Sequence, residues 1–219
     1  MKKGVIFDMD GTIVDSLPYH YEAWKIFFEE NKVENFSEKL KEYRGGGTLD
    51  LMKAVYGDIY SREKLKKMSN DKETIFREIY KGNIRPLEGF IDFVKELKSK
   101  KILIGLASNA IRLNVNLILR EIKGYNFFDS IICGDEVIYG KPNPEMFNET
   151  VKRFNLKKED CLIFEDSLEG IKGAVNSGIT SIGVKTSSSK KVLTDSGAKA
   201  VVKDYVNVYD KLKEIGLYF

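Results

Sequence analysis

Two aspartates, Asp8 and Asp10, stand two residues apart at the end of an apolar run that begins at Val5. Side chains at positions i and i+2 of a strand point to the same side of the sheet. Gly11 follows directly and releases the backbone into a turn, so both carboxylates are expected at the carboxyl end of the strand, where open α/β sheets bind ligands. Carboxylates at this range repel one another unless a cation lies between them or one is protonated. The spacing therefore predicts a divalent-metal site in which one aspartate acts as an acid or base.

Taken alone, Asp-x-Asp-Gly is also typical of an ordinary polar turn that closes a strand. Three later segments distinguish the two interpretations, because each places polar side chains where an apolar run meets a loop. They are Leu106-Ala107-Ser108-Asn109, Gly140-Lys141-Pro142-Asn143-Pro144-Glu145 and Ile163-Phe164-Glu165-Asp166-Ser167. Together with the first segment, and in this order, they resemble the four signature motifs of the haloacid dehalogenase-like hydrolase superfamily, over most of the chain.

The resemblance implies a catalytic role for each aspartate of the first motif. Asp8 corresponds to the nucleophile, a carboxylate that attacks phosphorus and splits one difficult displacement into two easier ones. Asp10 corresponds to the general acid/base that protonates the leaving oxygen and then activates water. Dehalogenase members lack this second aspartate, so the pair favours phosphoester chemistry over cleavage of carbon–halogen bonds.

Glu165 and Asp166 end another apolar run and bring the cluster to four carboxylates. Such a cluster needs a counter-ion, and hard oxygen ligands suit Mg²⁺. By resemblance, the Mg²⁺ ligands are the Asp8 carboxylate, the Asp10 backbone carbonyl and Asp166. Glu165 is expected near the metal site without binding the ion directly. A capping role for Glu165 and Asp166 at a helix that begins near Ser167 is compatible with this assignment.

Lys141 precedes Pro142, which disfavours a helical backbone at the lysine and projects its side chain from a loop. A loop lysine is otherwise simply solvated, but its surroundings resemble the third motif, whose lysine neutralises the transferring phosphoryl group. Ser108 ends a predicted strand directly before a predicted helix, where free N–H groups and the helix dipole bind anions. Ser108 and Asn109 are each expected to donate one hydrogen bond to the phosphoryl group. A plain N-cap is the alternative for Ser108.

Strand-like and helix-like runs alternate from residue 83 onward. The expected strands are 102–107, 129–133, 161–164, 179–184 and 200–202, and the expected helices are 111–122, 144–154, 168–176 and 205–215, with residues 186–189 as a short loop. This rhythm predicts an α/β fold, a doubly wound parallel sheet of Rossmann-like type with the Asp8 strand in its interior. The core domain would comprise residues 1–15 and 83–219.

Residues 16–82 break this rhythm, because they show helical spacing in 17–28, 49–55 and 63–80 and no convincing strand. We interpret them as a small helical cap domain, which the superfamily places between its first two motifs. His20, the chain's single histidine, lies in a His-x-x-Ala-Trp pattern that resembles the β-phosphoglucomutase-like branch, where the histidine lies near the acid/base aspartate. A lone helical histidine is more often incidental.

The loop Arg44-Gly45-Gly46-Gly47-Thr48 resembles the substrate-specificity loop of the cap, with Arg44, Gly45, Gly46 and Thr48 as candidate substrate contacts. A flexible turn between helices is an equal alternative. β-Phosphoglucomutases carry basic residues in this loop and in a later cap helix that grip a second phosphate. Thr48 and Ser69 align with those positions, which favours a phosphatase, although Arg44, Lys67 and Lys72 are cations available to replace them.

Composition sets further limits on function. The net charge of +3 over 219 residues, with lysine and glutamate mixed throughout, gives no support to nucleic-acid binding. No apolar stretch reaches the 18 or so residues of a membrane span, so we expect a cytoplasmic protein without a membrane partner. Cys133 and Cys161 lie in apolar runs and are expected to be free, buried thiols. Nothing in the sequence demands more than a monomer.

These observations predict a Mg²⁺-dependent phosphomonoesterase that hydrolyses a small phosphate ester, such as a sugar phosphate, through an aspartyl-phosphate on Asp8. A hexose-phosphate mutase of the β-phosphoglucomutase type is the nearest alternative. A phospho-accepting regulatory domain of the receiver type is the alternative from another class. Asp10, the helical insert and the chain length all argue against a receiver.

Overall fold

The computed structural model describes residues 1–36, 38 and 47–219, which divide into two compact units. The larger unit consists of Met1–Asp15 and Ile84–Phe219, and the smaller one of Ser16–Asn83. The second boundary therefore lies one residue later than the sequence pattern places it. Each unit has its own core and is described separately below.

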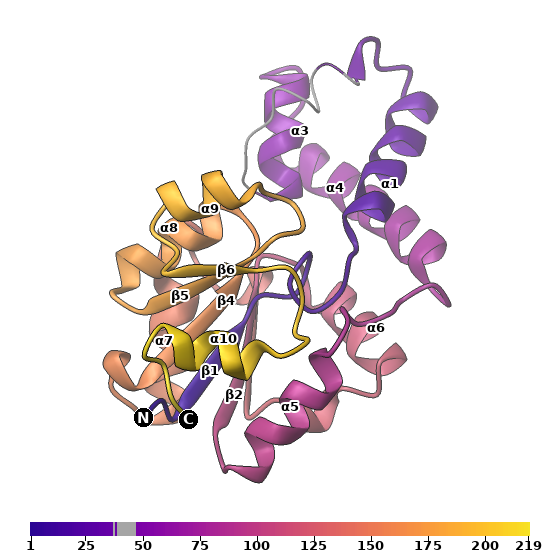
Figure 1. The fold of residues 1–219 in the computed structure, drawn as a ribbon. Coiled ribbons are helices and arrows are strands. Elements are labelled where there is room, and N and C mark those ends of the chain that lie inside the picture. The colour runs from indigo at the N-terminus through magenta and orange to yellow at the C-terminus, as the bar shows by residue number, and fades with distance from the viewer. Residues whose placement is uncertain (37, 39–46) are drawn as a thin grey trace. The chain divides into compact units, whose positions relative to one another are not determined.

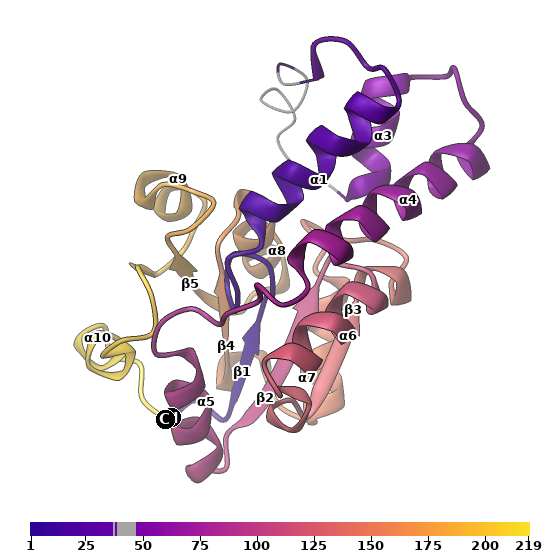
Figure 2. The same cartoon turned by 90° about the vertical axis from the view of Figure 1, so that its right-hand side faces the viewer.

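The larger unit is built on a six-stranded sheet in which all neighbouring strands are parallel, in the order β3-β2-β1-β4-β5-β6 (Figure 1 and Figure 2, with β3 labelled in Figure 2). The strands are β1 (Gly4–Phe7), β2 (Leu103–Ser108), β3 (Ser130–Cys133), β4 (Cys161–Glu165), β5 (Thr180–Val184) and β6 (Ala200–Val202). The helices are α5 (Phe90–Ser99), α6 (Arg112–Glu121), α7 (Glu145–Phe154), α8 (Leu168–Ser177), α9 (Lys190–Asp195) and α10 (Val208–Glu214), with 3-10 turns η1 (Tyr125–Phe127), η2 (Gly134–Glu136) and η3 (Lys158–Asp160). The predicted α/β class with a parallel sheet is confirmed, and β1 lies in the sheet interior.

Other segments of the chain cover both faces of this sheet. The central strands are mainly apolar, and successive side chains along a strand point to opposite faces. Ile6 and Ile163 pack against a layer that α7 and α8 supply, including Phe147. Their neighbours Phe7 and Phe164 stack at 5.2 Å on the opposite face. There they meet three aromatic side chains, Phe90 and Phe93 of α5 and Tyr205 of the C-terminal segment. Figure 2 shows α5 and α10 on one side of β1 and β4.

Two helices of this unit, α5 and α9, were not expected from the sequence. The buried residues of α5, Phe90, Phe93, Val94 and Leu97, follow the spacing i, i+3, i+4, i+7 of one helix face. The pattern was therefore present in the sequence. Helix α9 spans only six residues, and its N-cap, Ser189, is the last residue of the segment expected to be a loop.

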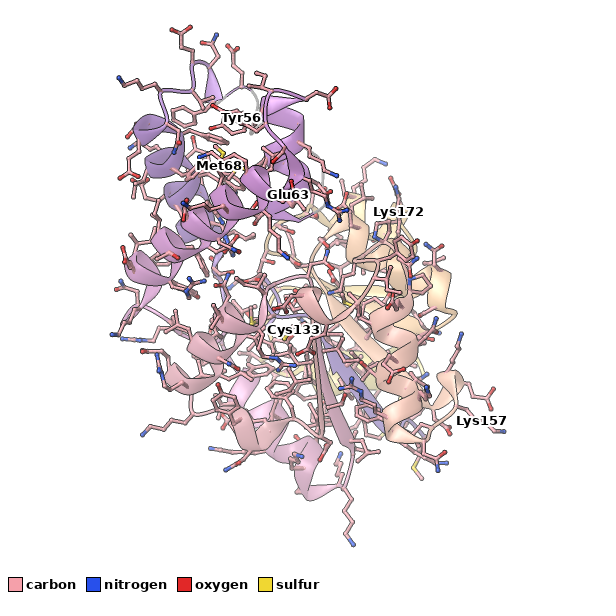
Figure 3. All side chains as sticks on the ribbon, turned by 180° about the vertical axis from the view of Figure 1, so that it is seen from behind. Tyr56, Glu63, Met68, Cys133, Lys157 and Lys172 are labelled. Carbon is pink, nitrogen blue, oxygen red and sulfur yellow. The ribbon has the colours of Figure 1, made fainter. Side chains whose placement is uncertain are left out.

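The smaller unit consists of helices α1 (Leu17–Glu30), α3 (Thr48–Tyr56) and α4 (Arg62–Tyr80) among its described residues. Pro18 lies in the first turn of α1, where its missing N–H costs nothing, and the Ser61 side chain caps α4 by accepting from Lys64 N. The core of the unit includes Trp24 and Phe28, whose rings stack at 5.1 Å. Tyr56 and Met68, labelled in Figure 3, belong to the same core.

Cys133 and Cys161 are both buried and free, as predicted, and Figure 3 shows Cys133 inside the larger unit. Burial raises the pKa of the Cys133 thiol to about 12 and that of Cys161 to about 11, so neither is a reactive thiolate. Among the helices in the described part of the chain, none combines the length and apolar character needed to cross a membrane.

Candidate active site

The register of the sheet brings the first, second and fourth sequence motifs to one place. Phe7, the last residue of β1, pairs with Leu106 of β2 on one side and with Phe164 of β4 on the other. Asp8 therefore emerges between these two strand ends, and its backbone N–H donates to the Phe164 carbonyl at 3.0 Å. Asp10 follows in a tight turn and is half-buried, forming an isolated bridge with Val14.

Lys141 enters the same place from the loop that precedes α7. Its Nζ donates to Asp8 Oδ1 at 2.6 Å, to Glu165 Oε1 at 2.7 Å and to the Ala107 carbonyl at 2.8 Å. The residue is 5% exposed, so the ammonium is held by these acceptors and by the Phe147 ring, whose centroid is 5.1 Å away. The third motif is thus joined to the other three by direct contacts.

Glu165 fixes Lys141 and the start of α8 at the same time. While Oε1 accepts from Lys141, Oε2 accepts from the Asp166 N–H at 2.9 Å and from the N–H and hydroxyl of Ser167, each at 3.0 Å. Gly170 leaves the space for this carboxylate, because a Cβ there would lie 1.8 Å from the Glu165 carboxyl carbon. Both oxygens of Glu165 are therefore engaged by the protein, which suits a supporting position behind the metal ligands.

Asp166 is held by a loop in which the sequence analysis placed no function. Thr186 Oγ1 lies 2.5 Å from the Gly11 carbonyl and 3.1 Å from Asp166 Oδ2, and Ser187 Oγ donates to the Asp166 carbonyl at 2.8 Å. Gly11 has a φ of +77°, and a Cβ there would lie 2.0 Å from Asp166 Oδ2. Only glycine lets the turn after β1 approach Asp166 this closely.

The buried cluster carries more negative than positive charge. Asp8, Glu165 and Asp166 each offer a carboxylate oxygen within 4.8 Å of the others. Against these three carboxylates, Lys141 supplies one ammonium, which pairs with Asp8 and Glu165. Burial, reinforced by the neighbouring carboxylates, raises the pKa of Asp8 well above its ordinary value, with Lys141 opposing the shift. Burial and the charge of Glu165 raise the pKa of Asp166 to about 7. The pKa of Lys141 is also raised, because its two carboxylate partners outweigh the effect of burial.

This donor set fits Mg²⁺. When all three carboxylates are ionised, they and the one ammonium leave two uncompensated negative charges, which a divalent ion balances. Carboxylate oxygens are the hard ligands that Mg²⁺ prefers. Asp8 and Asp166 are the residues that would hold the ion, and Glu165 and Thr186 orient Asp166 through hydrogen bonds.

The surroundings of Ser108 differ from expectation. Helix α6 begins at Arg112, four positions after Ser108, and its Arg112 N–H is taken by Asp135 Oδ1 at 3.0 Å. The prediction that Ser108 directly precedes a helix N-terminus is therefore wrong, and the plain N-cap alternative fails with it. The strand end is correct: Ser108 is 1% exposed, and its Oγ accepts from the Ala110 N–H at 3.1 Å.

Asn109 follows β2, and its side chain contacts the loop that carries Lys141. Its side-chain Oδ1 accepts from the Lys141 backbone N–H at 3.0 Å. The structure therefore gives the Asn109 amide oxygen a task in holding the loop, besides the phosphoryl contact expected from sequence.

The helical unit contains a separate buried polar cluster. Lys72 Nζ lies 2.8 Å from His20 Nδ1 and 3.1 Å from Glu73 Oε1, and Thr48 Oγ1 also donates to Glu73. Lys72 and Glu73 are 1% and 4% exposed, so the lysine charge is already balanced inside the unit. His20 and Thr48 thus share one network, whereas Arg44, Gly45 and Gly46 lie outside the described residues.

Comparison with known proteins identifies the family. Residues 5–184 match the family model described as haloacid dehalogenase-like hydrolase, so the chain belongs to this family and the predicted resemblance is confirmed. A relative named phosphorylated carbohydrates phosphatase, from Thermotoga maritima, is 31% identical over 97% of this chain and 99% of its own length. A β-phosphoglucomutase from Bacillus subtilis is 27% identical over 83% of each chain.

A solved structure shares the fold. The crystal structure of a β-phosphoglucomutase from Clostridium difficile covers 98% of this chain and 97% of its own, with a TM-score of 0.83 and 24% sequence identity. At this sequence identity, the similarity confirms the α/β architecture with its helical insert, and it does not indicate a substrate.

Proposed function

We propose that this chain is a Mg²⁺-dependent phosphomonoesterase that hydrolyses a small phosphorylated metabolite, specifically a sugar phosphate. The observation that carries the proposal is the buried contact of Lys141 with Asp8, at 2.6 Å, with Asp10 two residues further along the chain. A cation held against a carboxylate at the carboxyl end of a parallel strand provides a nucleophile and charge neutralisation for a phosphoryl group. The carbohydrate-phosphatase name of the Thermotoga relative supports the substrate class.

The chain's own residues account for the proposed steps. The Asp8 carboxylate attacks phosphorus and forms an aspartyl-phosphate, while Asp10 donates its proton to the departing alkoxide oxygen. Asp10 then takes a proton from water, whose oxygen attacks the phosphorus and releases inorganic phosphate with Asp8 regenerated. Lys141 and the Ser108 hydroxyl stabilise the charge on the phosphoryl oxygens, together with the Asn109 side-chain N–H. When bound, Mg²⁺ supplies Lewis-acid polarisation of a phosphoryl oxygen and shields it from the charge of Asp8.

We assign leaving-group selection to the helical unit, with His20, Thr48 and the loop at Arg44 as substrate contacts. A mutase must also grip a second phosphate. Lys72, one of the cations available for that task, is paired with Glu73 and buried beside Trp24. This observation favours hydrolysis over the β-phosphoglucomutase reaction. We expect the enzyme to act as a cytoplasmic monomer on a small molecule, without nucleic-acid or membrane partners.

The substitution Asp8→Asn tests the proposal, because an amide neither attacks phosphorus nor binds Mg²⁺ well. We expect turnover of p-nitrophenyl phosphate to fall below detection while circular dichroism and the melting temperature show a folded protein. Release of phosphate from hexose monophosphates by the wild type, without conversion of β-glucose 1-phosphate to glucose 6-phosphate, separates phosphatase from mutase. Substantial activity in Asp8→Asn would refute the phosphoenzyme route. Stoichiometric labelling without turnover in the wild type would favour the regulatory domain instead.

A further inference from the structure

The loop that carries Lys141 is held by one carboxylate at the start of α7. Glu145, the first residue of that helix, accepts the backbone N–H of Ile138 on Oε1 and that of Tyr139 on Oε2, both at 3.0 Å. Carboxylates in the first turn of a helix commonly interact with that helix's own free N–H groups. Here the carboxylate instead joins α7 to residues 138 and 139, which precede Lys141 in its loop.

The side chains of Ile138 and Tyr139, the two residues that Glu145 holds, do not anchor the loop, whereas Val137 before them packs against the core. Ile138 is 82% exposed and Tyr139 is 62% exposed, so neither contributes the packing that usually fixes a loop. Helix α7 in contrast is firmly anchored, since Met146 and Phe147 are fully buried. The two bonds to Glu145 therefore transmit the rigidity of α7 to the loop.

Lys141 lies two residues after the clamped segment, and its neighbours continue the same framework. Its backbone N–H is held by Asn109, and the Pro142 carbonyl accepts from Asn176 Nδ2 at 3.0 Å. Further along, the Asn143 N–H donates to the Gly140 carbonyl at 3.0 Å. Each bond fixes one point of the loop, and Glu145 fixes Ile138 and Tyr139, whose own side chains are exposed.

We propose that Glu145 is a positioning residue for catalysis, which holds the 138–141 loop so that the Lys141 ammonium meets Asp8. The inference rests on the proposed role of Lys141 in phosphoryl transfer. Glu145 acts through the backbone and touches no reacting atom. A displacement of about 1 Å at a catalytic group costs about 10²-fold in rate, so the effect of losing the clamp is measurable.

Helix α7 offers a matched control. Glu149 lies one turn after Glu145, and both line the same surface groove of about 470 Å³. Glu149 pairs instead with Arg153 and Lys152 on the helix surface. Glu149→Ala therefore makes the same change of charge and side-chain size, on the same helix and groove, without releasing the loop.

The test measures the rate of Asp8 phosphorylation and the steady-state constants with p-nitrophenyl phosphate, for Glu145→Ala, Glu149→Ala, Lys141→Ala and the double variant Lys141→Ala/Glu145→Ala. We expect Glu145→Ala to lower kcat about 10²-fold with little change in KM, and Glu149→Ala to stay within twofold of the wild type. The double variant should be no slower than Lys141→Ala, because the clamp then has nothing left to position. Glu145→Gln, which keeps one acceptor oxygen, should be intermediate.

Two results would overturn the inference while leaving the proposed function intact. One is a loss in Glu145→Ala that multiplies the loss of Lys141→Ala, since that reveals a general structural effect. The other is an equal loss in Glu149→Ala. A full rate in Lys141→Ala would instead refute the proposed function itself. If Glu145→Ala melts early, Glu145→Gln and its double variant with Lys141→Ala give the same comparison.

Discussion

At the level of single residues, the site depends on side chains that each serve two neighbours. Lys141 links Asp8 to Glu165, and Glu165 in turn links Lys141 to the N–H of Ser167, the N-cap residue of α8. A compact ammonium with three donors matches three acceptors that converge from different strands, whereas the planar fork of an arginine does not. Removal of any member leaves a buried charge without its partner, which is more costly than a lost surface pair.

Thr186 provides a residue-scale prediction. Thr186→Val keeps the shape of the side chain and removes the hydroxyl that lies between Gly11 and Asp166. We expect the affinity for Mg²⁺ to fall about tenfold, because residues that orient metal ligands typically contribute 10- to 100-fold. Titration calorimetry with Mg²⁺ measures this directly. Thr186→Ser should bind as the wild type does, and so should Ser188→Ala in the same loop; equal affinity in Thr186→Val would remove Thr186 from the site.

The sequence identified some of these residues and missed others for a physical reason. Asp8 and Asp166 stand where apolar runs end, and charged side chains in such positions are conspicuous; Lys141 stands in a Gly-Lys-Pro segment that resembles a known motif. Thr186 belongs to a run of small polar residues that is typical of any loop, and its partner Asp166 is 20 residues away. Glu145 was seen only as part of a motif, since its bonds go to backbone groups, which leave no trace in the sequence.

At the level of elements, regular alternation was readable and irregular connections were not. The strands are short apolar runs that alternate with helical segments. Their existence and their parallel direction therefore follow from the sequence. Helix α9 was missed because six residues are too few to show a periodic pattern. The helix expected over 111–122 is present as α6, but Ser108 does not directly precede it. A turn in which the Gly134 N–H donates to the Ala110 carbonyl separates β2 from α6.

Helix α8 carries the element-scale prediction. Gly170→Ala introduces a Cβ that would lie 1.8 Å from the Glu165 carboxyl carbon, so either the helix or Glu165 must shift. We expect a loss of about 1–3 kcal/mol in the free energy of unfolding, as is usual for overpacked sites, together with reduced activity. Denaturant titration and turnover of p-nitrophenyl phosphate measure the two effects.

Gly178, at the other end of α8, is the matched control. It has a φ of +74° with open space around its Cβ position, so Gly178→Ala costs about 1–2 kcal/mol of backbone strain. Activity should be retained in Gly178→Ala, because this change does not reach Glu165. Full activity in Gly170→Ala would show that Glu165 tolerates displacement and does not hold Lys141.

At the level of the whole molecule, the two units form their cores from different residues. The core of the smaller unit is formed by α1, α3 and α4, whereas the buried carboxylates Asp8, Glu165 and Asp166 all belong to the larger unit. In the function that we propose, phosphoryl transfer takes place in the unit built on the parallel sheet. The proposed role of the helical unit in substrate selection would then rest on a unit that has its own core.

The last prediction follows from this division. An ion that binds the folded cluster and not the unfolded chain stabilises the larger unit by about 2.7 kcal/mol at 100 times its dissociation constant. For a chain of this length, that corresponds to a rise in Tm of about 5–10 °C in the calorimetric transition of the larger unit. Chelator should reverse the rise. Asp166→Asn should abolish it, whereas Asp195→Asn, which removes an equal charge from the exposed end of α9, should keep it. A Tm that is independent of Mg²⁺ in the wild type would contradict a metal site in this cluster, and a rise that persists in Asp166→Asn would place the ion elsewhere.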